Sequence, residues 1–174
     1  LLSDTLVIDL LSSFSQFTGI YVFMNSMWGW PIIESLHFVG LCLLLGTVGV
    51  FDLRMLGLAK QIPYKDLHRL VPLGVAGYLI NVVTGIMFLT TSPDQYVHNP
   101  AFQTKMLFML LAGINMLVFY GFFNQHASNA GIAPLPTRIK LVAGISLIAW
   151  SVIIVCGRLI TYFRPPYHWC FWCY

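Results

Sequence analysis

Histidines are the side chains in this sequence that are best suited to chemistry, because the chain is otherwise strongly apolar. Of its 174 residues, 58% are hydrophobic and only 9% are charged, yet five are histidines. Imidazole serves as an axial ligand of haem iron, as a metal ligand and as a proton carrier near neutral pH. Three of them mark one end of the apolar stretches and two mark the other end: His37, His98 and His168 against His68 and His126.

Histidines at two levels of a membrane bundle are typical of cytochrome-b-type proteins, in which facing helices each give an imidazole to haem iron. We expect one level to hold one haem b and the other level a second, although a single haem is equally compatible with the pattern. The competing interpretation is that these histidines are interfacial or solvated. The candidate cofactor-binding residues, with the arginines expected to bind haem propionates, are His37, His68, His98, His126, Arg54 and Arg69.

His37 is the histidine that is hardest to explain without a function, since it lies within an apolar stretch. Ionisable residues inside a membrane span are functional candidates. Glu34 precedes His37 by three residues and therefore shares its helical face. Such a pair can hold a proton or orient a ligand, whereas a structural hydrogen bond between Glu34 and His37 is the competing interpretation.

The end of the chain brings three further ligand types together. Cys170 and Cys173 form a CxxC motif, and His168 precedes it by two residues. These side chains match the preferences of a soft metal ion. A disulfide between the cysteines, or a tail anchored at the membrane by its aromatic residues, explains the same motif without a metal.

The elements that must position these residues are four apolar stretches, at residues 31–51, 71–91, 106–123 and 141–162. Each is close to the ~20 residues with which a helix crosses a ~30 Å hydrocarbon layer. Inside the bilayer every backbone polar group needs a partner within its own segment, which favours helices. The sequence therefore predicts an all-α integral membrane protein, a four-transmembrane-helix bundle over residues 31–162.

The flanking regions are expected to lie outside the hydrocarbon. Residues 5–28 carry apolar side chains at helical spacing with polar ones mostly off that stripe, which predicts an amphipathic interfacial helix within residues 1–30. A fifth span is the alternative interpretation of that segment. Pro31 is expected to begin the first true span, and residues 163–174 form an aromatic and cysteine-containing tail.

Charge predicts the orientation of the chain, although its net value is only +3. Six of the nine Lys and Arg residues fall in the connections after the first and third stretches: Arg54, Lys60, Lys65, Arg69, Arg138 and Lys140. By the positive-inside rule these connections face the cytoplasm. We therefore expect a bacterial inner-membrane protein with both termini in the periplasm, and the absence of a basic run argues against nucleic acid as a partner.

Several short motifs resemble those of a known family. They are the run from Trp30 to His37, the run from Phe51 to Gly57 with its Asp-Leu-Arg, and Leu70 to Gly74. Over residues 5–162 the chain resembles a family of small four-span bacterial membrane proteins of unknown function. That family is similar in outline to cytochrome-b-like and copper-resistance-type bundles. The resemblance implies an amphipathic N-terminal helix before four spans, and the cysteine-containing tail is not part of its pattern.

Two functions from different classes follow. The first is a membrane-embedded b-type haem protein that carries electrons from a quinone to a periplasmic partner. The second is a cofactor-free accessory subunit of a larger membrane complex, which would contact other membrane subunits through glycine-bearing helix faces. No hydrolase or transferase motif is present, and four spans without a visible inverted repeat argue against a transporter.

Overall fold

The computed structural model describes residues 2–59, 61–125 and 135–163, and this part of the chain is helical throughout with no strand. The predicted all-α fold is therefore confirmed. In chain order the elements are α1 (Leu2–Phe17), α2 (Ile20–Met24), α3 (Gly29–Leu56), α4 (Tyr64–His68), α5 (Val71–Thr91), η1 (Pro93–Gln95), α6 (Pro100–Val118), the π turn η2 (Phe119–Phe123), α8 (Thr137–Leu159), and η3 (Ile160–Tyr162).

Four of these helices are long and apolar enough to cross a membrane, as predicted. They are α3, the stretch from Asp66 through α5, α6 with η2, and α8 (Thr137–Leu159) with η3. Helix α5 itself has the predicted bounds of the second span, but the other three spans extend further into polar flanks than hydropathy suggests. The first begins at Gly29 rather than at Pro31.

Local capping explains where two of these helices begin and end. Asn99 caps the start of α6, where its side-chain oxygen accepts from the backbone N–H of Ala101 at 3.0 Å and of Phe102 at 3.3 Å. Gly57 ends α3 with a φ of 91°, a left-handed conformation that glycine adopts without strain. Because caps set the helix ends, the spans do not stop where apolar residues stop.

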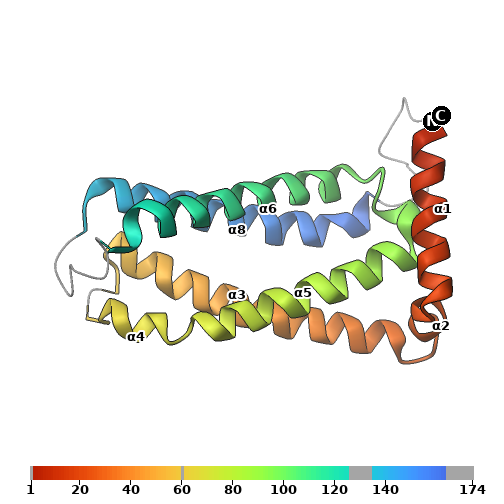
Figure 1. Ribbon diagram of the computed structural model, residues 1–174, viewed down its shortest axis with the longest axis horizontal. Helices are drawn as coiled ribbons and strands as arrows, with labels where there is room; N and C mark the ends of the chain where they lie inside the picture. The colour runs from red at the N-terminus through yellow and green to blue at the C-terminus, as the bar shows by residue number, and fades with distance from the viewer. Residues whose placement is uncertain (1, 60, 126–134, 164–174) are drawn as a thin grey trace.

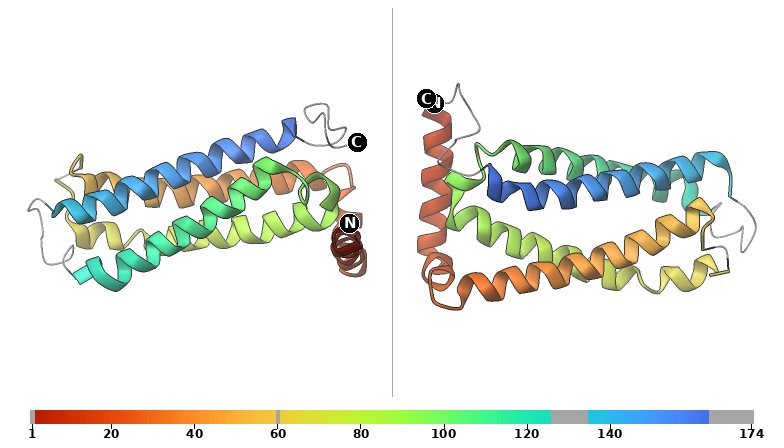
Figure 2. Two further views of the ribbon diagram at one scale, coloured as in Figure 1. Left: turned by 90° about the horizontal axis from the view of Figure 1, so that it is seen from above. Right: turned by 180° about the vertical axis from the view of Figure 1, so that it is seen from behind.

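The N-terminal helix α1 lies across one end of the bundle (Figures 1 and 2). It packs against α5 and η1, and Gly19 (φ 76°) separates it from α2. The single amphipathic helix predicted over residues 5–28 is therefore broken into two. A helix that runs across the spans, with Leu10 and Phe17 exposed, fits the predicted interfacial role better than a fifth span.

The four spans form two pairs (Figure 1). Helix α3 packs along α5, α6 packs along α8, and the pairs meet mainly where α3 contacts α8. Among the described residues α5 and α6 share at most a marginal contact. The bundle is therefore closed on its α3–α8 side and loose on its α5–α6 side.

The α3–α5 seam is tight because two glycines meet there. A Cβ atom on Gly77 would lie 2.6 Å from the carbonyl oxygen of Gly40, and one on Gly40 would lie 2.9 Å from that of Gly77. Small residues allow two membrane helices to approach this closely. These glycines therefore serve helix packing, whereas a Cβ on Gly46, Gly49 or Gly85 would meet no atom within 4 Å.

The main apolar cluster lies toward the other end of the bundle, where α4 is found. Its buried members are Met55, Phe119, Leu135, Ile139 and Ala143. Nearby, the Asn115 side chain on α6 donates to the carbonyl of Val142 on α8 at 3.1 Å, a hydrogen bond between the two helices. The two ends of the bundle are called the α1 end and the α4 end below.

Candidate functional site

His37 lies on α3 toward the α1 end and faces α5. Its Nδ1 atom is 2.7 Å from the hydroxyl oxygen of Thr84 on α5, and its ring is half-buried. This interhelical pair replaces the hydrogen bond between Glu34 and His37 that was one interpretation of the sequence. Two helices therefore hold this imidazole in place.

The hydrogen bonds of Thr84 favour one of the two neutral forms of His37. The Thr84 hydroxyl donates its single hydrogen to the carbonyl of Ile80 at 2.7 Å. The same oxygen must then accept from Nδ1–H of His37, because one hydroxyl has only one hydrogen. The neutral imidazole consequently keeps its lone pair on Nε2, the arrangement in which histidine can bind a metal.

Aromatic rings fix the orientation of His37 further. Phe88 lies edge-on to the imidazole, with ring centroids 5.6 Å apart, and Trp30 stacks on Phe88 at 5.4 Å. Lys105 on α6 lies close enough to act on His37 electrostatically, and its Nζ is 3.7 Å from the position of a Cβ on Gly157 of α8. The site thus combines an oriented imidazole with a cation from the other helix pair.

Tyr96, in the connection between α5 and α6, belongs to the same end of the molecule. Burial, and then the charge of Glu34, raise the pKa of the Tyr96 phenol to about 12. The phenol is therefore protonated under ordinary conditions and can act as a hydrogen-bond donor.

The other described candidate ligands do not join His37. His68 ends α4, is exposed, and has Tyr120 edge-on at a centroid distance of 6.2 Å. Thr84, the partner of His37, lies 13 residues after Val71, where α5 begins, which is about 20 Å along the helix, and His68 lies before that start. His98 is exposed in the connection before α6. The structure therefore separates His37 from His68, as two levels require.

The two arginines expected to bind propionates lie toward the α4 end. Arg54 is 2% exposed, and its Nε donates to the carbonyl of Ile62 at 2.7 Å, which ties α3 to the connection that follows it. Arg69 follows α4 and is exposed. Arg54 thus has a structural role that accounts for its burial, and propionate binding stays a prediction for both residues.

Four predicted ligands lie outside the described residues, so their placement and the expected pairing of His68 with His126 stay predictions. They are His126, His168, Cys170 and Cys173. Within the part of the chain that is described, no group of three or more His, Cys, Asp or Glu side chains is arranged to hold a metal ion.

A cavity of about 700 Å³ lies between the two helix pairs. All four spans line it, and most of the lining is apolar. Asp52, Asn115 and Ser146 are polar members of the lining. None of the three described histidines, His37, His68 and His98, lines this cavity, so it is a second region distinct from the surroundings of His37.

Asp52 lines this cavity and is not among the site residues that the sequence predicts. It is 7% exposed, the Ser146 hydroxyl hydrogen-bonds to its carboxyl group, and its Oδ2 atom has no partner among the described residues. A carboxyl group in an apolar helix is a signal that the sequence does carry. The sequence does not show that α6 and α8 leave a cavity next to Asp52.

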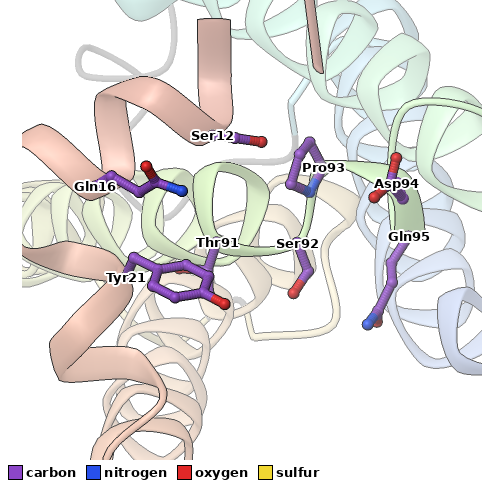
Figure 3. Close-up of a pocket in the computed structure, with 8 residues that line it drawn as sticks. All are labelled: Ser12, Gln16, Tyr21, Thr91, Ser92, Pro93, Asp94 and Gln95. Atoms are coloured by element: carbon purple, nitrogen blue, oxygen red, sulfur yellow. The ribbon is translucent and has the colours of Figure 1, made fainter. Parts of the chain in front are cut away.

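A polar hollow of about 650 Å³ occurs at the α1 end, where α1 and α2 meet the end of α5 and η1 (Figure 3). Two of its hydroxyl groups are used within their own helices: Ser12 donates to Ile8 O at 2.8 Å and Thr91 to Met87 O at 2.7 Å. Asp94 is the single charged residue among the described residues that line it.

Comparisons with known proteins agree with the resemblance at family level. No curated protein and no solved structure matches the chain. The sequence model of a family of unknown function (DUF6644) matches residues 14–163, which include α3, α5, α6 and α8 and hence both His37 and Asp52. The chain, which has four helices long and apolar enough to cross a membrane, belongs to this family of unknown function.

Proposed function

We propose that this protein carries electrons in a membrane with a b-type haem, to which His37 gives an axial ligand. The observation that carries the proposal is the hydrogen bond from His37 Nδ1 to Thr84, because it leaves the Nε2 lone pair free. Histidines that bind metals commonly donate their other ring N–H to such a partner, which fixes both tautomer and orientation.

His37 would hold the haem iron in this proposal, and other residues near it would hold the rest of the group. Haem iron carries one electron by alternating between its ferric and ferrous states, and its potential depends on axial ligands and their hydrogen bonds. Lys105 offers a cation for a propionate close to His37. His98, exposed in the neighbouring connection, is the candidate for the second axial position, and a quinone is the proposed electron donor.

The first test is an absorption spectrum of the purified chain, made with haem available, before and after reduction by dithionite. We expect a reduced band in the haem-b alpha region that His37→Ala removes. A featureless spectrum from well-folded protein would contradict the proposal. A band that His68→Ala removes and His37→Ala leaves intact would instead move the haem to the α4 end.

A second variant separates ligand geometry from simple loss of a ligand. Thr84→Val removes the acceptor for Nδ1–H, so we expect haem to stay bound with a shifted midpoint potential. Thr90→Val is the matched control, because the Thr90 hydroxyl is bonded to carbonyls of its own helix, with Ile86 O at 2.8 Å. Equal potentials in the two variants would count against His37 as a ligand.

The alternative function, a cofactor-free accessory subunit, draws support from glycines that the bundle itself does not use. A Cβ atom on Gly46, Gly49, Gly85, Gly113 or Gly144 would meet nothing within 4 Å. Small residues without a neighbour suit contact with a helix of another subunit. Pigment-free protein that stays folded and co-purifies with membrane partners would favour this function over the haem.

A further inference from the structure

We propose that the cavity between the two helix pairs binds a slender lipophilic molecule that carries a hydroxyl group, which hydrogen-bonds to Asp52. The proposal concerns a different region from His37, and it stands whether or not the chain binds haem.

The cavity is long and largely apolar. Its lining on α6 and η2 runs from Met106 to Tyr120, which corresponds to about 21 Å along these helices. Its volume of about 700 Å³ falls within the range of pockets that bind small molecules. An elongated apolar molecule matches both the shape and the lining.

Asp52 gives this cavity one definite polar requirement. Its carboxyl group is buried and lines the cavity, and its Oδ2 atom has no hydrogen-bond partner among the described residues. A buried polar atom left unpaired costs about 1–3 kcal/mol, so a ligand that pairs with it gains that energy. Nearby polar groups are already engaged: Ser146 bonds to Asp52 itself, and the Asn115 amide donates to Val142.

The chemistry of the lining selects a hydroxyl group. A hydroxyl both donates and accepts, so it can pair with Oδ2 whether or not the carboxyl group holds a proton. A primary ammonium has three N–H donors, whereas the described lining offers one unpaired carboxyl oxygen. An anionic head group is disfavoured because Asp52 is the single charged residue among the described residues of the lining.

The ligand can enter from the bilayer through the loose α5–α6 side. Val75 and Tyr78 on α5, and Leu110, Ile114 and Leu117 on α6, line the cavity and are also exposed on the bundle surface. Since α5 and α6 share at most a marginal contact in the described structure, the opening faces the surroundings of the bundle. For a chain that crosses a membrane, those surroundings are lipid.

Trp150 provides a readout, because it lines the cavity one helical turn from Ser146. That turn corresponds to about 6 Å along α8 toward the α1 end. A bromine near the sixth carbon of a chain whose hydroxyl contacts Asp52 therefore lies near the indole and quenches its fluorescence. The probes are 6-bromododecan-1-ol and the matching 6-bromododecane, added to the full chain in lipid nanodiscs.

We expect saturable quenching by the alcohol, with an affinity about tenfold above that of the bromoalkane after correction for membrane partitioning, as one net hydrogen bond allows. Trp150→Phe removes the cavity signal and reports the background of the other tryptophans. Quenching that does not saturate, or equal affinities of alcohol and alkane, would overturn the proposal.

Asp52→Leu assigns the recognition to this residue, and Asp94→Leu in the connection before α6 is the matched control. We expect the first to abolish the preference for the alcohol and the second to keep it. A preference that survives in folded Asp52→Leu protein would overturn the role of Asp52. If that variant does not fold, the comparison of alcohol with alkane in the unaltered chain still decides whether the cavity recognises a hydroxyl.

Two sources of such a hydroxyl are distinguished by competition. A hydroquinone with a short isoprenoid tail represents quinols, and a monoacylglycerol represents lipid alcohols. Displacement of the brominated alcohol by one of them supports the proposal and identifies the source. Failure of both to displace it would contradict a site for natural hydroxyl-bearing lipophiles.

Discussion

The two seams in which α3 takes part differ in how closely the neighbouring helices approach. Against α5, Gly40 and Gly77 bring the backbones together, and His37 pairs with Thr84 across the seam. The Oδ1 atom of Asn81 on α5 is also buried there without a partner among the described residues. Against α6 and α8, the same helix faces a cavity, and one oxygen of Asp52 has no partner in the described structure. A membrane helix can thus have one closely packed face and one face that borders a cavity.

The largest effect is expected when a side chain is introduced into the closely packed seam between α3 and α5. Gly77→Val places a Cβ atom within 2.6 Å of the Gly40 carbonyl oxygen, and backbone atoms there cannot yield without separating the helices. We expect a loss of about 3 kcal/mol or more in the free energy of unfolding, or no folded protein. Gly85→Val, in open space on the same helix, is the control, and equal unfolding curves for both variants would contradict the tight seam.

The next effect tests the polar pair of that seam. Thr84→Val keeps the side-chain shape but leaves Nδ1–H of His37 without its acceptor, so we expect a loss of about 1–3 kcal/mol in unfolding experiments. Thr90→Val, whose hydroxyl bonds only to its own helix, should lose less. A loss as large in Thr90→Val would show that the His37 contact adds nothing.

A smaller, pH-dependent effect concerns Tyr96 at the α1 end of the same seam. Its pKa is raised from 10.0 to about 12 in the folded chain, so the unfolded chain releases this proton first as the pH rises. Its contribution to stability is present below pH 10 and is lost between about pH 10 and 12, with an expected total of about 1–2 kcal/mol. Thermal unfolding should therefore fall more steeply over this interval in the unaltered chain than in Tyr96→Phe, and parallel curves would argue against a buried phenol.

The smallest effect is expected at the cavity between the two helix pairs. Asp52→Leu removes a buried carboxyl group with an unpaired oxygen, so the free energy of unfolding should stay the same or rise by about 1 kcal/mol. The free energies of unfolding of Asp52→Leu and Thr84→Val should be compared directly, because both variants remove a polar group from a span. A loss of several kcal/mol in the free energy of unfolding of Asp52→Leu would mean that the carboxyl group stabilises the fold, and it would argue against a role in ligand binding.

Hydropathy was sufficient to predict the four spans, because length and composition alone decide whether a helix can cross a bilayer. It was not sufficient for their ends, which depend on caps such as Asn99 and Gly57, or for the break at Gly19. His37 was found because an ionisable residue inside a span is conspicuous. Its partner Thr84, on another helix, became evident only from the packing of α3 against α5.

The cavity was beyond prediction for a related reason. The sequence shows Asp52 itself, but the ordinary residues around it give no sign of a cavity. An empty space arises from how two helix pairs diverge, which no single segment encodes. The position of an acidic residue can therefore be read from a sequence, but the presence of a cavity beside it cannot.

Helix α3 has one further consequence for where ligands come from. His37 and Asp52 are 15 residues apart on it, which corresponds to about 22 Å of a hydrocarbon layer ~30 Å thick. With α3 centred in the bilayer, the two groups belong to opposite leaflets. A lipophile that reaches Asp52 is then drawn from the leaflet at the α4 end, and anything that reaches His37 is drawn from the other, so lipid asymmetry itself would determine which of the two regions is occupied.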